Sequence, residues 1–159
     1  MATAMGSIAY SLSATIAGLT ATSDTGEAGD HFRVASQMRD WESRPDSDKD
    51  REFTVEYGMV EDALTIGRTT DQLFTGELQI RIGHAKQVST GSGSTAHKYS
   101  TFRRDLDLEL IGRKVQDPSN YPSGCCLIVK TGESREDQER HWITTMTFAV
   151  TYLGTAIGQ

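Results

Sequence analysis

The stretch HWITTMTFAVTYLG, residues 141–154, decides the predicted fold of this chain. Its residues alternate between two kinds, as in a half-buried strand whose neighbouring side chains point to opposite faces of a sheet. One face carries Trp142, Thr144, Met146, Phe148, Val150 and Tyr152, and the other carries Ile143, Thr145, Thr147, Ala149 and Thr151. The first face is mostly large and apolar, so we expect it to belong to the core.

The second face of this strand is small, β-branched and neutral. It lacks the Lys and Glu that usually protect an open sheet surface, so we expect a helix or another subunit to cover it. Because no catalytic motif is found elsewhere, we interpret it as a packing surface for one of the two helices predicted below. If it is bare in a single subunit, it becomes the leading candidate for a subunit interface.

Further strands are predicted before this stretch. Residues 125–130 form an apolar run that is joined to it by a charged turn, so the last two strands make a hairpin. Alternation also predicts strands at 53–57 and 74–82, and a short strand at 32–36. The segment 60–72 between two of these strands has no clear period, so it carries either an extra short strand or a turn of helix.

Two segments have helical spacing. In residues 4–19 the apolar side chains recur every three or four positions, which predicts an amphipathic helix. Residues 99–116 are ambiguous. Tyr99, Phe102, Leu106 and Leu110 form a helical stripe, continued by Ile111 and Val115, whereas Leu106, Leu108 and Leu110 alternate with acidic residues as in a strand. We favour the helix, because the segment is long for a strand and a proline follows it.

The predicted order is helix, three strands, helix, two strands. Partly segregated elements of this kind indicate an α+β fold, with a mostly antiparallel or mixed sheet of about five strands and two helices packed on one face. We expect a single domain over residues 1–154 and a C-terminal tail over 155–159. The charged loop 39–51 is predicted to be solvated, and the Gly/Ser/Thr-rich loop 88–98 to be flexible.

Composition excludes some function classes. The chain has 159 residues and a formal net charge of −6, and it has no run of Lys and Arg to displace counterions from nucleic acid. Its only cysteines, Cys125 and Cys126, are adjacent, and a disulfide between them would be strained, so we expect a reduced, cytosolic protein. The first basic residue is Arg33, so we expect no signal peptide, and the apolar N-terminal run is too interrupted to span a bilayer.

Short motifs give no support for catalysis. Residues 24–26, Asp-Thr-Gly, resemble the motif of retroviral-type aspartic proteases, and Ile111-Gly112-Arg113 resembles a second motif of that family. However, the segment before Asp24 is not an apolar strand, and Ile-Gly-Arg also occurs at residues 66–68. No phosphate-binding glycine loop and no nucleophile elbow are present. We therefore predict no catalytic residue.

Metal and cofactor sites are not predicted either. The four histidines, His31, His84, His97 and His141, lack the spacing of a metal site. The acidic cluster Asp46, Asp48 and Asp50 lacks the glycine and final glutamate of a calcium loop. The second cluster, Asp105, Asp107 and Glu109, is interpreted as a solvated face.

Taken together, the order of elements resembles the tail terminator (tail completion) proteins of long-tailed bacteriophages. The residues that carry the resemblance are the N-terminal amphipathic helix, the strand LQIRIGHA at 78–85, the helix beginning near Arg103-Arg104-Asp105, and the final strand TMTFAVTYLG at 145–154. The resemblance covers residues 4–154. The long loops 39–51 and 88–98 and the tail 155–159 depart from a minimal member of that family.

The resemblance implies a structural virion protein of the tail or neck, assembled in the host cytoplasm. Six copies would form a ring on the head-proximal end of the tail tube, stop tube polymerisation and meet the head-completion or neck protein. DNA would pass through the channel without specific binding. Six subunits of charge −6 would bring about −36 to the ring, which would keep DNA from its wall.

Five residues are predicted to make subunit or partner contacts: Trp41, Arg44, Phe74, Arg103 and Arg104. Replacing both Arg103 and Arg104 by Glu is expected to weaken assembly without unfolding the subunit. Two alternatives to the terminator stay open: a head-tail connector of the neck, and a small cytosolic α+β enzyme or ligand-binding module.

Overall fold

A computed structural model describes residues 4–21, 31–35, 50–65, 71–89, 96–98 and 101–155. Its helices are α1 (Met5–Ala17) and α3 (Thr101–Gln116), with a short 3₁₀ turn η3 (Pro118–Asn120). Its strands are β1 (Arg33–Val34), β2 (Glu52–Thr65), β3 (Asp71–Ala85), β4 (Gln87–Ser89), β5 (Ala96–Lys98), β6 (Cys125–Asp137) and β7 (His141–Thr155). The predicted α+β class is confirmed, and residues 99–116 contain a helix as favoured.

Five strands form one mixed sheet in the order β1-β2-β3-β7-β6. Only the short β1–β2 pair is parallel, and the other pairs are antiparallel. The stretch 141–154 is therefore a central strand, paired with β3 on one side and with its hairpin partner β6 on the other. A separate two-stranded hairpin, β4–β5, joins the two ends of the loop 88–98 that was predicted to be flexible; residues 90–95 lie outside the described part.

Strand β2 is longer than predicted. It continues through residues 60–65, where the sequence shows no clear period, and it pairs with β3 over most of its length. The register shifts twice, between Tyr57 and Val60 and between Asp62 and Leu64. Each shift inserts one extra residue into β2 relative to β3, which interrupts period-2 alternation although the strand continues.

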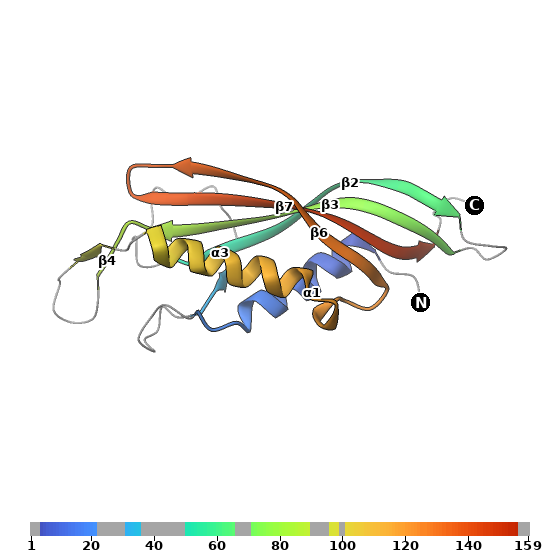
Figure 1. Ribbon diagram of the computed structural model, residues 1–159, viewed down its shortest axis with the longest axis horizontal. Coiled ribbons are helices and arrows are strands. Elements are labelled where there is room, and N and C mark those ends of the chain that lie inside the picture. The colour runs from blue at the N-terminus through green and yellow to red at the C-terminus, as the bar shows by residue number, and fades with distance from the viewer. Residues whose placement is uncertain are drawn as a thin grey trace.

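Both helices lie on the same side of the sheet (Figure 1). The face of β7 that was predicted to be core packs there: Met146, Phe148 and Val150 are completely buried. The core also contains Ile8, Leu12 and Ile16 of α1 and Leu108, Ile111 and Val115 of α3. The large apolar face of the central strand therefore attracts both helices.

The opposite face was expected to pack against a helix, and this prediction was wrong. Thr145, Thr147, Ala149 and Thr151 of β7 remain partly exposed, and neither helix reaches them (Figure 1). The physical reason is the apolar area of the two faces. Thr and Ala offer less apolar surface than Met, Phe and Val, so packing the helices on the Met146, Phe148 and Val150 face is more favourable.

The outer edge of the sheet at β6 is partly closed by side chains. The Tyr121 hydroxyl accepts from the Ile128 amide at 3.1 Å and has two carbonyl acceptors for its one proton, Gln116 at 3.2 Å and Ile128 at 3.4 Å. The Gln116 side chain accepts from the Lys130 amide at 2.9 Å. Backbone groups that are bonded in this way cannot pair with another strand, so this part of the edge is protected.

Candidate functional site: a charged anchor and an open sheet face

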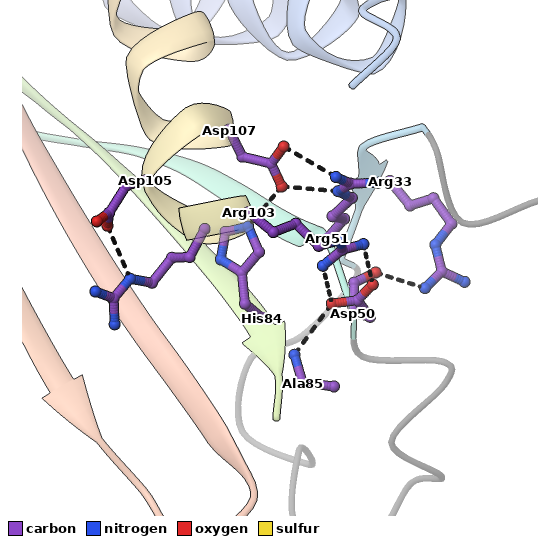
Figure 2. A network of polar contacts seen from close by, with 9 residues as sticks. Arg33, Asp50, Arg51, His84, Ala85, Arg103, Asp105 and Asp107 are labelled. Carbon is purple, nitrogen blue, oxygen red and sulfur yellow. Dashed lines mark hydrogen bonds and ion pairs between the residues drawn. The ribbon is translucent and has the colours of Figure 1, made fainter. Parts of the chain in front are cut away.

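The first turns of α3 are anchored by buried charges (Figure 2). Asp107 accepts two hydrogen bonds from the Arg51 guanidinium, at 2.7 Å to Oδ2 and 3.0 Å to Oδ1. His84 Nε2, at the end of β3, lies 2.8 Å from the same Oδ2. Arg51 and Asp107 are 0% and 1% exposed. A two-pronged ion pair of this kind fixes the orientation of both partners.

A second ion pair lies beside the first. Arg103, one helical turn before Asp107, donates to both carboxylate oxygens of Asp50, at 2.8 and 3.2 Å. The backbone amide of Ala85 donates to Asp50 Oδ1 at 3.1 Å, and Arg33 donates to the Asp50 backbone carbonyl at 2.9 Å. The anchor, defined as Asp50, Arg51, His84, Arg103 and Asp107, thus ties α3 to the start of β2 and the end of β3.

Arg51 adopts an unusual backbone conformation. Its φ angle is 60°, in the left-handed region that costs a residue with a side chain roughly 1 kcal/mol or more. The conformation is held by two backbone hydrogen bonds, from the Arg51 amide to Gly83 at 2.9 Å and from Arg33 to the Arg51 carbonyl at 3.0 Å. The guanidinium also lies 5.7 Å from the ring centroid of Phe32. These contacts offset the strain and direct the side chain to Asp107.

The anchor keeps Asp107 ionised. Burial alone would raise the pKa of Asp107, but the hydrogen bonds and charges of His84 and Arg51 outweigh burial and leave the pKa below its ordinary value. Because this carboxylate accepts only, the proton of its hydrogen bond with His84 is assigned to Nε2 of the imidazole. His84 Nδ1 has no hydrogen-bond partner in the described structure.

A His–Asp pair can also serve catalysis, so its access matters. His84 and Asp107 are essentially buried, and neither of the two surface hollows described below includes them. Two carboxylates face two guanidinium groups, so the charges balance inside the subunit. We interpret the anchor as a structural device that positions α3.

The first hollow is an open groove between α3 and β6. It is lined by Asp105, Leu108, Glu109, Gly112, Arg113, Gln116, Asp117, Pro118, Lys130, Glu133 and Arg135. Its charges pair with one another: Glu133 contacts Lys130 at 2.8 Å and Arg135 at 3.0 Å. Burial raises the pKa of Glu133, but these two cations more than compensate and lower it. Glu133 is therefore not held protonated for acid catalysis.

The second hollow lies on the uncovered face of the sheet. It is lined by Gly58, Thr75, Gly76, Glu77, Thr131, Phe148 and Ala149. Uncharged residues lie in and around this hollow, beside Glu77. We call these residues the open patch: Thr75, Leu127, Val129, Thr147, Ala149 and Thr151. The strand pairing places Leu127 beside Thr151 and Val129 beside Ala149, so the patch is continuous across β3, β7 and β6. Leu127 and Val129 are 50% and 43% exposed.

Three of the predicted contact residues lie in the described structure. Phe74 is half-buried and stacks on Tyr152, with ring centroids 5.6 Å apart. Arg103 belongs to the anchor. Arg104 is buried, pairs with Asp105 at 3.2 Å and lies 5.1 Å from the Trp142 ring centroid. Each residue therefore has a role inside the subunit, and their contacts with partners stay predictions.

Trp41 and Arg44, the other two predicted contact residues, lie outside the described residues. The loop that contains them was expected to be solvated throughout, but its last two residues, Asp50 and Arg51, are buried. The acidic cluster on α3 was also expected to be solvated, and Asp107 is buried. Both expectations were wrong for the same reason, because each charge finds an opposite charge from the other segment.

The double replacement of Arg103 and Arg104 by Glu must be reconsidered too. It would place a second carboxylate, at position 103, beside Asp50 in a buried site, so we now expect unfolding rather than a selective loss of assembly. The helical stripe also differs from the prediction, because Phe102 is 68% exposed and Leu106 half-buried, whereas Arg103 and Asp107 face the sheet. A search for helical periodicity among apolar residues alone misses a helix face whose charged residues are buried in ion pairs.

The described residues contain no group of three or more His, Cys, Asp or Glu placed to hold a metal ion. Within that part of the chain, no helix is long and apolar enough to cross a membrane. No model of a known protein family matches the chain, and no curated protein sequence matches it. The functional argument therefore depends on the geometry of the subunit.

Proposed function

We propose that this chain is a structural subunit that assembles with copies of itself, as the tail terminator of a long-tailed bacteriophage. The observation that carries the proposal is the open patch of uncharged residues on the sheet face that the two described helices leave uncovered. Exposed apolar patches on soluble subunits typically mark protein interfaces. The element order that resembles tail terminators gives the assembly its form, a hexameric ring.

In this proposal the ring caps the head-proximal end of the tail tube, stops its polymerisation and receives the head-completion or neck protein. The rigid sheet would hold subunit contacts in place, and DNA would pass through the channel without specific binding. The negative charge of the chain supports that last step, because like charge opposes adhesion of DNA. The virion is the proposed location.

Native mass spectrometry of the purified chain, alone and with purified tail tubes, tests the proposal. We expect six-subunit rings, either in solution or on tube ends, and tubes that no longer elongate once capped. Elongation is measured by electron microscopy of tube lengths after tube protein is added. A chain that stays monomeric and leaves tube growth unchanged would overturn the proposal.

A ligand-binding module is the second candidate, and the groove between α3 and β6 is the observation that favours it. A ligand with separated positive and negative groups would suit its alternating charges. Gly112 lines the groove, and a Cβ added there would meet no heavy atom within 4 Å, so Gly112→Trp is a substitution that places a large side chain in the groove. The self-assembly proposal predicts normal rings for this variant, whereas a ligand-binding function predicts lost binding in a small-molecule screen.

A further inference from the structure

Helix α1 carries a second uncharged surface, on the side of the subunit opposite the open patch. Its sequence, MGSIAYSLSATIA, contains no charged residue. Met5, Ile8, Leu12 and Ile16 are buried against the sheet, whereas Ser7, Tyr10 and Ala14 are exposed. The solvent face of a surface helix normally carries charges, so this face is unusual. Tyr10 is 80% exposed, the highest value among the exposed large hydrophobic residues of the described structure.

Several hydroxyl groups on or beside the two surfaces already have partners within the subunit. On α1, Ser13 donates to the Ala9 carbonyl at 2.9 Å and Thr15 donates to the Ser11 carbonyl at 3.1 Å. On the sheet, the Thr131 hydroxyl donates to the Thr147 carbonyl at 3.3 Å. Covering a polar group is costly only when it loses hydrogen bonds to water without replacement. These three hydroxyl groups can therefore be covered at low cost.

The two surfaces also match in shape. Tyr10 projects from α1 as a single large side chain between the small residues Ser7 and Ala14. The hollow in the open patch has small residues at its rim, and at Gly58 an added Cβ would meet no heavy atom within 4 Å. Glu77 lines the hollow and is exposed, so it offers an acceptor to a phenol hydroxyl. The hollow thus offers a tyrosine side chain a recess bordered by small residues and a hydrogen-bond acceptor.

We infer that α1 of one copy docks on the open patch of the next copy, with Tyr10 inserted into the hollow lined by Gly58, Glu77 and Ala149. This rests on the proposed self-assembly and names the surfaces that carry it. Helix and patch lie on opposite sides of the sheet (Figure 1), so each contact leaves one free helix and one free patch. Such a head-to-tail contact repeats and closes into a ring when its rotation allows.

The size of the contact favours a ring over an isolated pair. A helix of this length is about 20 Å long and about 10 Å wide, so it covers less than the roughly 800 Å² per partner of a standard stable interface. In a closed ring every subunit makes two such contacts, and the last contact to form is intramolecular. We therefore expect few free dimers of the unmodified chain.

Two arginine substitutions test the inference. Tyr10→Arg removes the projecting ring and adds a charge, and Ala149→Arg fills the hollow. Each variant is expected to weaken assembly by at least about tenfold in native mass spectrometry, while its thermal midpoint stays that of the unmodified chain. Phe102→Arg is the matched control for an exposed aromatic residue on the other helix, and Ser134→Arg is the control for the same sheet face away from the hollow; both should assemble normally.

Mixing the two variants gives the sharper result. Tyr10→Arg keeps an intact patch and Ala149→Arg keeps an intact helix, so a mixture in equal amounts allows one functional contact per pair. Because one contact alone is weak, the mixture is measured at a protein concentration well above that at which the unmodified chain forms rings, and there we expect mixed dimers, identified by their masses, that do not grow further. If Ala149→Arg lowers the thermal midpoint, Thr75→Arg on the other wall of the hollow replaces it. A symmetric contact between two open patches would instead let Tyr10→Arg assemble alone.

The outcomes separate this inference from the proposed function. If the unmodified chain forms rings and either Tyr10→Arg or Ala149→Arg also does, the docking inference is overturned and self-assembly stands. If the unmodified chain neither assembles nor caps tubes, the proposed function fails and the inference fails with it. If both variants fail to assemble and their mixture also stays monomeric at that raised concentration, the two surfaces do not meet and the inference is overturned.

Discussion

Successive residues of strand β7 point to opposite faces of the sheet, and the two faces differ in burial. Met146 and Phe148 are completely buried beneath both helices, whereas Thr147 and Ala149 remain partly exposed on a face that no described helix covers. Neither set is charged. The difference is therefore one of apolar area rather than of charge: the helices cover the face that removes more apolar surface from water. The other face of β7 stays open although it carries no charge, and the proposed self-assembly would account for that.

The packed side also contains the charged anchor, and its loss should give the largest effect. Asp107→Ala leaves Arg51 without its buried carboxylate, so we expect the free energy of unfolding to fall by about 3 to 5 kcal/mol. Asp105→Ala is the control on the same helix, because Asp105 is exposed and should change stability by less than about 1 kcal/mol. Urea denaturation measures both. Equal losses would mean that the buried pair contributes no more than a surface pair.

A neighbouring pair on β7 compares the two faces directly. Met146→Ala removes a buried side chain and should cost about 3 kcal/mol, within the usual range for a large core residue. Thr147→Ala, on the open face, should change the free energy of unfolding by less than about 0.5 kcal/mol in the isolated subunit. Urea denaturation at a concentration where the chain is monomeric is the measurement. A large loss for Thr147→Ala would show that its face is covered within the subunit.

The sheet could be predicted well from sequence because its strands alternate. The 141–154 stretch, its hairpin partner and the core face of the helix at 4–19 all follow from the spacing of apolar residues. The length of β2 could not be predicted, because two register shifts interrupt its alternation. The uncovered face could not be predicted either, since a neutral strand face has the same sequence pattern beneath a helix as in an interface.

The anchor illustrates a different limit. Arg51 and Asp107 are 56 positions apart in the sequence, and a charged residue has the same letter whether it is solvated or buried in a pair. The only local signal is that Asp50-Arg51 directly precedes a strand while Arg103 and Asp107 lie one helical turn apart, which gives two opposite pairs. Such a pattern is common on exposed surfaces, so it would have been a weak guide.

Lowering the pH should remove the stability that Asp107 contributes through the anchor, whereas the described apolar core has no group that titrates in acid. The pKa of Asp107 is lower in the folded than in the unfolded chain, so near these pKa values the unfolded chain binds more protons. The contribution of Asp107 to the free energy of unfolding is therefore fully present above its unfolded pKa of about 3.9. It is lost as the pH falls through the folded pKa. We expect urea midpoints to drop more between pH 4 and pH 3, roughly across that window, for the unmodified chain than for Asp107→Asn. Equal drops would contradict the assignment.

The smallest effect concerns two adjacent thiols at the start of β6. Cys125 is half-buried, and burial raises its pKa to about 11, whereas Cys126 is exposed. The thiolate is the reactive form, so at about pH 8 Cys125 should be alkylated at least about a hundredfold more slowly than an ordinary exposed cysteine with a pKa of about 8.5. Iodoacetamide labelling followed by peptide mass spectrometry measures both sites. Cys126→Ser is the control, because the remaining reaction then reports Cys125 alone. Fast labelling of Cys125 in that variant would mean that this end of β6 opens readily. The difference between buried and exposed neighbouring residues that is seen on β7 would then not hold on the edge strand β6.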